Sequence, residues 1–101
     1  MIKFEWDDEK NVLNFQKHKI WFEDAESVFY DPFERTERNK ESDDEERFQI
    51  IGRSSLDKPL FVVFTIRDED TVRIITVRPP TPHEWRSYEQ RPKQKRRKAH
   101  P

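Results

Sequence analysis

The sequence predicts an α+β domain built on a four-stranded, mostly antiparallel sheet, with two N-terminal helices and one C-terminal helix. Three observations predict this fold class. An alternating apolar segment opens the chain, three segments rich in β-branched and aromatic residues follow one another with short connections, and a helix start signal comes directly after the last of them. The expected order is therefore β-α-α-β-β-β-α.

The first three elements occupy residues 2–31. Residues 2–6 alternate apolar and polar side chains, which predicts a strand. Asp7 suits the N-cap of a helix that runs to about His18, with Val12 and Phe15 facing inward. A second helix is expected next, because four apolar residues recur at helical spacing before Asp-Pro ends the pattern. These four are Phe22, Ala25, Val28 and Phe29.

The remaining strands and the last helix are the clearest signals. Residues 47–54 read as a half-exposed strand, whereas residues 60–66 and 71–78 are apolar on both faces and predict central strands. Short connections between them favour an antiparallel meander. A capping box then starts a helix over about residues 82–90, with N-cap, N1 and N3 positions filled in order. The residues are Thr81, Pro82 and Glu84.

Length and composition limit the possible classes of protein. A chain of 101 residues has room for one modest core, and although 41% of residues are charged, the 13% that are aromatic argue against disorder. The absence of cysteine excludes disulfides and thiolate chemistry. No apolar run is long enough to span a bilayer and the charged N-terminus does not resemble a signal peptide, so we expect a cytoplasmic protein with no membrane association.

Charge divides the chain into two parts. All 21 acidic residues lie at or before Glu89, whereas six of the 20 basic residues lie after it, so residues 1–90 carry a formal charge of −7 and residues 91–101 carry +6. We therefore expect a single domain over residues 1–90, followed by a basic, disordered tail. Such a tail favours polyanions, although by composition alone it can equally be a solubilising end.

At this level of detail the residues resemble a known family. The segments "KFEWD..KN..N..KH...FE.A..VF.DP", "ER...IG.S", "VV.T.R" and "RII..R.....E...YE" are together similar to the BrnT family of ribonuclease toxins of bacterial type II toxin–antitoxin systems, over residues 3–89. The resemblance implies a RelE/ParE-like fold and metal-independent RNA cleavage with no cofactor. It also implies neutralisation by a cognate BrnA-like antitoxin and binding of operator DNA by the complex.

The chain departs from the family pattern at three places. Lys19 stands where the family usually has glycine, and Trp21 stands where it usually has serine at a helix N-cap. After Arg78, where the family generally has small and basic residues, this chain has Pro79-Pro80. The two prolines matter for function, since they remove two backbone N–H donors and fix φ at both positions.

Metal-free RNA cleavage needs a base for the 2′-hydroxyl, an acid for the leaving 5′-oxygen and cations for the phosphorane. The three histidines have no ligand spacing, and no metal signature competes. With the resemblance, these requirements select candidate catalytic residues and candidate RNA- or phosphate-binding residues. The catalytic set is His18, Arg78, Glu84 and Tyr88, and the phosphate-binding set is Lys17, Arg47, Arg67 and Arg73.

Each candidate also has a structural interpretation. His18 can complement the dipole at the end of its helix, Glu84 completes a capping box, and Tyr88 can pack its ring on the sheet edge. Strand arginines are usually solvated or ion-paired, although several on adjacent strands would form a cationic patch suited to phosphate. Of the neighbours on the last helix, His83 is expected to be exposed and Trp85 to anchor in the core.

Two functions remain open. The first is an endoribonuclease that arrests growth by cutting messenger RNA. The second is a binding module of the same fold that has lost cleavage through the Pro79-Pro80 corner and acts only as an antitoxin partner or co-repressor.

Overall fold

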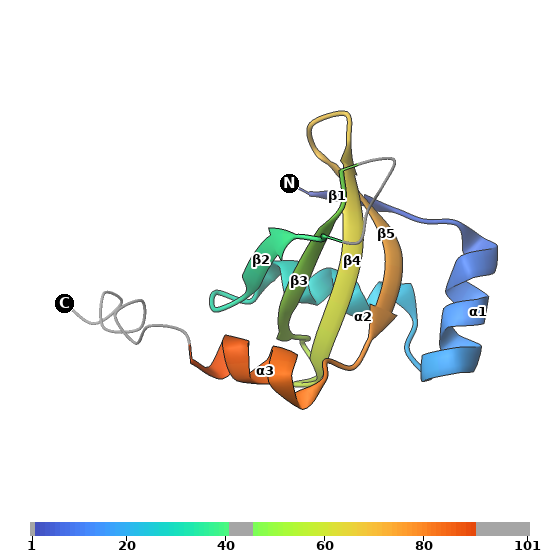
Figure 1. The fold of residues 1–101 in the computed structure, drawn as a ribbon. Helices are drawn as coiled ribbons and strands as arrows, with labels where there is room; N and C mark the ends of the chain where they lie inside the picture. The colour runs from blue at the N-terminus through green and yellow to red at the C-terminus, as the bar shows by residue number, and fades with distance from the viewer. Residues whose placement is uncertain (1, 41–45, 91–101) are drawn as a thin grey trace.

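The computed structural model of the chain describes residues 2–40 and 46–90, so the tail and the acidic segment 41–45 lie outside the described residues. Figure 1 shows an α+β fold with a mixed sheet of five strands, in the order β1-β5-β4-β3-β2. The strands are β1 (Lys3–Glu5), β2 (Arg35–Arg38), β3 (Phe48–Arg53), β4 (Pro59–Arg67) and β5 (Thr71–Arg78). The helices are α1 (Asp8–His18), α2 (Phe22–Ala25), the 3-10 helix η1 (Glu26–Tyr30) and α3 (Pro82–Glu89).

The predicted four-stranded sheet is thus one strand short. The missed strand is β2, which pairs antiparallel with β3 at the edge of the sheet. Its sequence, RTER, has no apolar residue, and three of its four positions are exposed. An edge strand with no buried face has no alternation for sequence reasoning to detect.

The three strands predicted from the apolar segments are confirmed. β3, β4 and β5 form an antiparallel meander, and β1 lies parallel to β5 through residues 71–73. β4 is the central strand, and five of its first seven residues are buried, as expected for a strand covered on both faces. Residues 2–6 therefore extend the sheet, but in parallel rather than antiparallel direction.

A bulge in β5 decides which side chains share a face. Val63 pairs with Thr76, but the next residue, Phe64, pairs with Ile74, so Ile75 is an extra residue in β5. In a regular strand, residues five apart point to opposite faces. The bulge resets this alternation, and Arg73 and Arg78 both pair with residues of one β4 face, Thr65 and Phe61.

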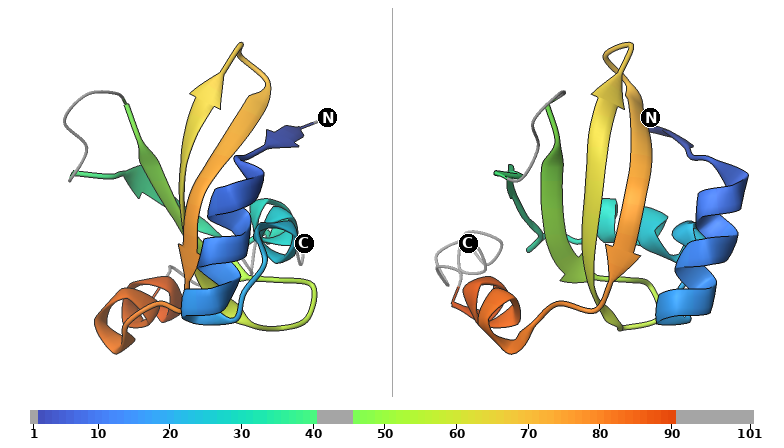
Figure 2. Two further views of the ribbon diagram at one scale, coloured as in Figure 1. Left: turned by 90° about the vertical axis from the view of Figure 1, so that its right-hand side faces the viewer. Right: turned by 45° about the vertical axis from the view of Figure 1, so that its right-hand side comes forward.

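The two faces of the sheet are covered differently. In Figure 2, α2 with η1 lies on one side of the strands and α3 lies on the other, at one end. The main core fills the α2 side, while Ile51 and Phe61 are buried on the α3 side. The main core consists of Ile20, Phe22, Ala25, Val28, Ile50, Leu60, Val62, Phe64, Val72, Ile74 and Val77.

Helix α1 is joined to the sheet by polar contacts. Asp7 caps it as predicted, accepting from the Lys10 N–H at 3.1 Å. The prediction that Val12 faces inward is wrong, since Val12 is 47% exposed whereas Asn14 is 8% exposed. The Asn14 amide donates to the Val77 carbonyl at 2.9 Å and accepts from the Val77 N–H at 3.1 Å. Asn14 therefore takes the place of a strand neighbour beyond the end of β1. Figure 1 shows α1 beside the β5 edge of the sheet.

The predicted second helix is an α-helical turn followed by a 3-10 turn, and its four apolar residues all reach the core as expected. Trp21 occupies the N-cap without a side-chain cap. The cap comes from α1 instead, because the side-chain oxygen Oδ1 of Asn11 accepts from the Phe22 N–H at 2.7 Å. A buried asparagine of α1 thus accepts from a backbone N–H at the start of α2 that the N-cap residue, Trp21, leaves without a partner.

Candidate functional site

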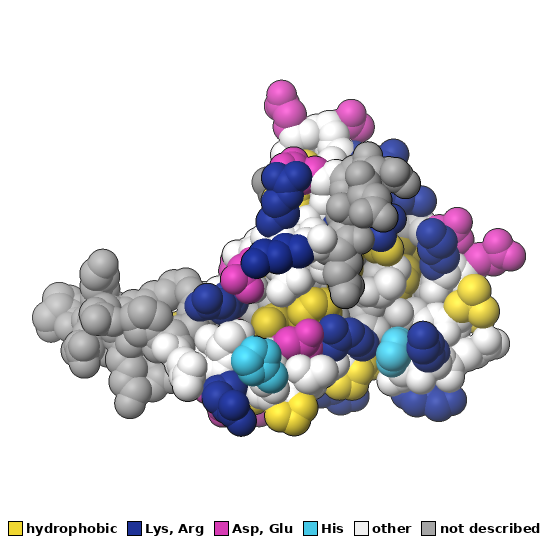
Figure 3. Space-filling view, viewed as in Figure 1, with side chains coloured by type: hydrophobic (Ala, Val, Ile, Leu, Met, Phe, Trp, Pro, Cys, Tyr) yellow, Lys and Arg dark blue, Asp and Glu magenta, His cyan; other side chains and the backbone are white. Residues whose placement is uncertain are grey.

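An open hollow of about 620 Å³ lies on the sheet face that α3 only partly covers. Figure 3 shows this face, with hydrophobic side chains flanked by acidic, basic and histidine side chains across its lower part. Strand residues form the floor of the hollow, while the end of β2 and the β5–α3 corner form opposite rims. The lining residues, here called the sheet hollow, are Glu37, Arg38, Asn39, Lys40, Gln49, Phe61, Val63, Thr76, Arg78 and Glu84.

The β5–α3 corner holds a bidentate ion pair. The two terminal nitrogens of Arg78 donate to the two carboxylate oxygens of Glu84 at 2.8 and 2.9 Å, and the guanidinium lies 4.0 Å from the centroid of the Phe61 ring. The pair is partly buried, with side chains 33% and 23% exposed. Glu84 also completes the predicted capping box with Thr81, which confirms that element. One carboxylate therefore orients the guanidinium and caps the helix at once.

The electrostatics of this pair keep Glu84 charged. The hydrogen bond from Arg78 lowers the pKa of Glu84 below its ordinary value, outweighing the opposing effect of burial. Hydrogen bonds from Thr81 act in the same direction. A carboxyl group with a lowered pKa is ionised at neutral pH, so it can hold a cation but is a poor proton donor.

His18 lies near the same corner because Asn14, one turn earlier on α1, is bonded to Val77 beside Arg78. Partial burial lowers the pKa of His18, and the charges of Lys17 and then Arg78 lower it further. The imidazole is therefore neutral at pH 7 and lies in a positive field. Of the predicted site residues, Arg78 and Glu84 are in direct contact, and His18, next to Lys17, lies near enough to Arg78 for its charge to lower the pKa of the imidazole.

The last turn of α1 also explains how the chain continues without the family's glycine. Lys19 adopts the left-handed conformation with φ 62°, and its N–H donates to the Phe15 carbonyl at 2.7 Å. Its ammonium group lies 5.7 Å from the Phe15 ring centroid. The helix thus ends with a left-handed residue as expected for this motif, at the steric cost of a side chain there.

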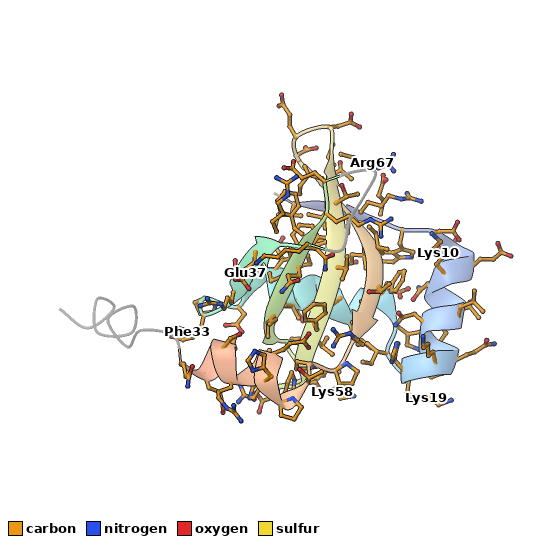
Figure 4. The ribbon with its side chains drawn as sticks, viewed as in Figure 1. Lys10, Lys19, Phe33, Glu37, Lys58 and Arg67 are labelled. Atoms are coloured by element: carbon orange, nitrogen blue, oxygen red, sulfur yellow. The ribbon has the colours of Figure 1, made fainter. Side chains whose placement is uncertain are left out.

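The other three predicted arginines do not join this corner. Arg73 is ion-paired with Glu5 of β1 at 2.9 Å, and Arg47 immediately precedes β3 and lies opposite Asn39. Arg67 ends β4 at the far end of the sheet, as Figure 4 shows by its distance from Lys58 and Lys19. Since Arg78 pairs with Phe61, six residues before Arg67, these two cations lie on the order of 20 Å apart.

Tyr88 is directed away from the sheet hollow. Its hydroxyl donates to Asp31 Oδ2 at 2.8 Å, and its ring stacks on Trp85 at 4.3 Å between centroids. The same Asp31 oxygen accepts from the Arg53 N–H at 2.8 Å. Asp31 therefore connects η1, β3 and α3, and the sequence pattern did not suggest this role.

The single glycine permits that connection. A Cβ on Gly52 would meet Asp31 Oδ2 at 3.0 Å and Val28 Cγ1 at 3.1 Å. The prediction that Trp85 anchors in the core is wrong, since Trp85 is half-buried and α3 has no buried residue. The Arg53 guanidinium lies 5.0 Å from the centroid of its ring. His83 is exposed, as expected.

Sequence reasoning also missed the polar floor of the sheet hollow. Gln49 and Thr76 flank Val63 in register, so the three side chains share one row on the open face. Single polar residues in a strand are indistinguishable from solvated positions in a sequence. Asn14 carried more signal, since a helix-interior asparagine next to a buried stripe competes with the backbone unless it has a partner.

Across residues 2–40 and 46–90, no group of three or more histidine or acidic residues could hold a metal ion. Within the same ranges no helix is long and apolar enough to cross a membrane.

Comparisons with known proteins agree with this fold. A family model described as "Ribonuclease toxin, BrnT, of type II toxin-antitoxin system" matches residues 6–84. The chain is also similar to the crystal structure of the Brucella abortus ribonuclease toxin BrnT, with a TM-score of 0.60 and 20% sequence identity, over 80% of this chain and 99% of that one. At this identity the likeness establishes the fold. No curated protein matches the chain.

Proposed function

Because the chain belongs to the BrnT family of ribonuclease toxins of type II toxin–antitoxin systems, we propose that it is a metal-independent endoribonuclease that cuts cytoplasmic RNA and arrests growth. A toxin of a type II system has an antitoxin partner. We propose that this partner is BrnA-like, that it neutralises cleavage, and that the complex binds operator DNA.

The observation that carries the proposal is the Arg78–Glu84 pair on the rim of the sheet hollow, with His18 near enough for the charge of Arg78 to lower its pKa. Cleavage would proceed by attack of the ribose 2′-oxygen on the adjacent phosphorus. The 2′-hydroxyl loses its proton, the bond from phosphorus to the 5′-oxygen breaks, and the products are a cyclic phosphate and a 5′-hydroxyl. A guanidinium at this point stabilises the negative charge that develops on the phosphoryl oxygens.

In this mechanism His18 is the base and Arg78 the electrostatic stabiliser. The lowered pKa of His18 keeps its imidazole neutral, as a proton acceptor requires. Glu84 fixes the plane of the guanidinium, and its own lowered pKa argues against a role as the acid. The Tyr88 hydroxyl donates a hydrogen bond to Asp31, which favours a structural role. Water would then protonate the leaving oxygen and recover a proton from His18.

Lys17 and the arginines outside the corner would bind the RNA backbone. Arg73, on the same sheet face as Arg78, and Arg47, ahead of β3, would contact phosphates beyond the cleavage site. Arg67, at the far end of β4, would contact a more distant one. These contacts contribute charge and therefore salt dependence rather than rate.

The decisive experiment compares purified variants on labelled RNA in the presence of EDTA. Arg78→Met should lower the cleavage rate by about 10²-fold or more, on the scale of losing one transition-state donor. The substitution also strands the Glu84 carboxylate, so the Arg78→Met, Glu84→Gln double variant is needed to remove that charge. The double variant should recover the melting temperature but not the activity.

Two further variants complete the test. His18→Ala should lose cleavage to a similar degree, whereas Arg86→Met, which removes an exposed guanidinium on α3 that does not line the sheet hollow, should cleave like the parent. Cleavage by the double variant at the parent rate would refute the role of Arg78. Loss of cleavage by the parent in EDTA would refute the metal-independent mechanism.

The second candidate function is a binding module without catalysis. It is favoured by one observation, that Pro79-Pro80 provide no N–H donors at the corner where phosphate would lie. In that case the parent would bind its antitoxin and leave RNA intact at any enzyme concentration, and expression without antitoxin would not slow growth.

A further inference from the structure

The floor of the sheet hollow carries hydrogen-bonding groups that the fold does not use. The Gln49 carbonyl oxygen accepts from the Asn39 amide at 3.3 Å. Among the described residues, neither the Gln49 amide nitrogen nor the Thr76 hydroxyl has a hydrogen-bond partner. These two groups lie on either side of Val63, in the same row across three strands.

The surroundings of this row are apolar below and charged at the rims. The half-buried Val63 provides an apolar floor beside Phe61, whose ring lies under the Arg78 guanidinium, and the hollow of about 620 Å³ is within the range of small-molecule sites. Unstacked RNA bases are recognised in this way, by contact of their faces with apolar or planar side chains and by hydrogen bonds to their edges. The corner with Arg78 forms one wall of the same hollow, so a base held there would place its neighbouring phosphate near that guanidinium.

The polarity of the available groups selects among the bases. With its oxygen already accepting from Asn39, Gln49 offers its NH₂ group, which is a pure donor. Of the two carboxylates that line the hollow, Glu84 is bonded to Arg78, and Glu37, the neighbour of Gln49 on β2, lies 3.9 Å from Arg35 in an exposed ion pair. The Gln49 NH₂ group can only donate and the Thr76 hydroxyl can donate as well as accept, so the two together complement a base edge that carries a keto oxygen, as in guanine and uracil, rather than an exocyclic amino group.

We propose that the sheet hollow is a nucleobase subsite in which Gln49 and Thr76 select a keto-bearing base next to the cleaved phosphate. This inference deepens the proposed ribonuclease function and rests on it. It assigns these two residues to specificity, whereas the corner of His18 and Arg78 is assigned to the chemistry.

The test measures cleavage of RNA oligonucleotides that differ at a single position, with guanine, uracil, adenine or cytosine there. The parent should cut the two keto substrates about tenfold or more faster, the scale of one good base contact. Gln49→Leu should reduce this ratio towards one. Gln49→Glu replaces the donor by an acceptor and should shift the preference towards adenine and cytosine, whatever uniform loss of rate its charge brings.

The control is Gln16→Leu, the same chemical change on an exposed position of α1, which should leave the ratio unchanged. A parent without base preference, or a Gln49→Leu variant with the parent's ratio, would overturn the inference while leaving the proposed function intact. If the parent does not cleave at all, the proposed function fails separately. Binding of the same sequences as uncleavable 2′-O-methyl oligonucleotides then decides the subsite by the same ratios.

Discussion

Asn14 offers the sharpest test of how α1 is held to the sheet. Val77 directs both its N–H and its carbonyl away from β4, towards the edge of β5. At this position β1 no longer pairs with β5. Asn14 satisfies both groups, at 3.1 and 2.9 Å, and its amide also donates to the Ile20 carbonyl at 2.9 Å. Replacing it with leucine keeps the branched shape of the side chain but removes all three partners.

The expected magnitude follows from these three contacts. A buried backbone group left without a partner costs about 1–3 kcal/mol. Three such groups at the lower half of that range give a loss of about 3–6 kcal/mol in the free energy of unfolding. That is a large part of the roughly 5–15 kcal/mol available to a domain. We therefore expect Asn14→Leu to be close to the limit of folding.

Asn11 provides a matched comparison on the same helix. It accepts from the Phe22 N–H at 2.7 Å and donates to the carboxylate of the exposed Glu23 at 2.8 Å, so Asn11→Leu strands one backbone group instead of three. The expected loss is about 1–2 kcal/mol. Urea unfolding followed by circular dichroism measures both variants. Equal losses, or a loss below about 1 kcal/mol for Asn14→Leu, would refute the idea that the helix is docked by these hydrogen bonds.

Four further predictions concern pH, backbone strain, packing and charge. Lys17→Gln should raise the pKa of His18, because it removes a nearby positive charge. The acid limb of kcat/KM, where a protonated base no longer works, should then move to higher pH, and an unmoved limb would argue against His18 as the base. The same lowered pKa makes this imidazole stabilise the fold above pH 6.5 and lose that contribution as pH falls through the folded pKa, which a titration of Tm in the parent and His18→Asn can detect. Lys19→Gly should raise the free energy of unfolding by about 0.5–1 kcal/mol, since glycine adopts the observed φ of 62° without steric cost; no gain in Tm would contradict this. Gly52→Ala should lower it by about 1–3 kcal/mol, because the new Cβ meets an oxygen and a methyl group at 3.0 and 3.1 Å, and an unchanged Tm would show that neither neighbour is fixed. Truncation after Gln90 removes six basic residues and should flatten the salt dependence of RNA binding, whereas an identical slope would make the tail irrelevant to RNA.

The elements with an apolar face were predictable from the sequence. β3, β4 and β5 follow runs of β-branched and aromatic residues, and α3 follows a complete capping box at Thr81. β2 was not predictable, because its pairing with β3 uses backbone groups that every residue possesses. The inward face of α1 was wrongly predicted for a related reason. Hydrophobic periodicity cannot identify the buried face of a helix that contacts the rest of the fold through asparagine side chains.

The candidate site divides along the same line. Arg78 and Glu84 were named from a short stretch of sequence, and their contact depends on a capping box that the sequence also contains. The proximity of Arg78 to His18, 60 positions earlier, depends on Asn14 and could not be read from local patterns. The bulge at Ile75, which places Arg73 and Arg78 on one face, leaves no mark in the composition of β5.

The absence of buried residues in α3 has a consequence for the motions of the site. Polar and planar contacts hold this helix to the rest of the fold, among them the pair between Arg78 and Glu84, the hydrogen bond from the Tyr88 hydroxyl to Asp31, and the stack of Arg53 on Trp85. Segments with few buried apolar contacts open at a small fraction of the global unfolding free energy. The amides of α3 should therefore exchange with solvent deuterium well before those of β4, through a partly open form in which the sheet remains folded. In that form the wall of the sheet hollow that Glu84 of α3 provides is missing. The protein would therefore alternate between a complete and an incomplete site while the sheet stays folded.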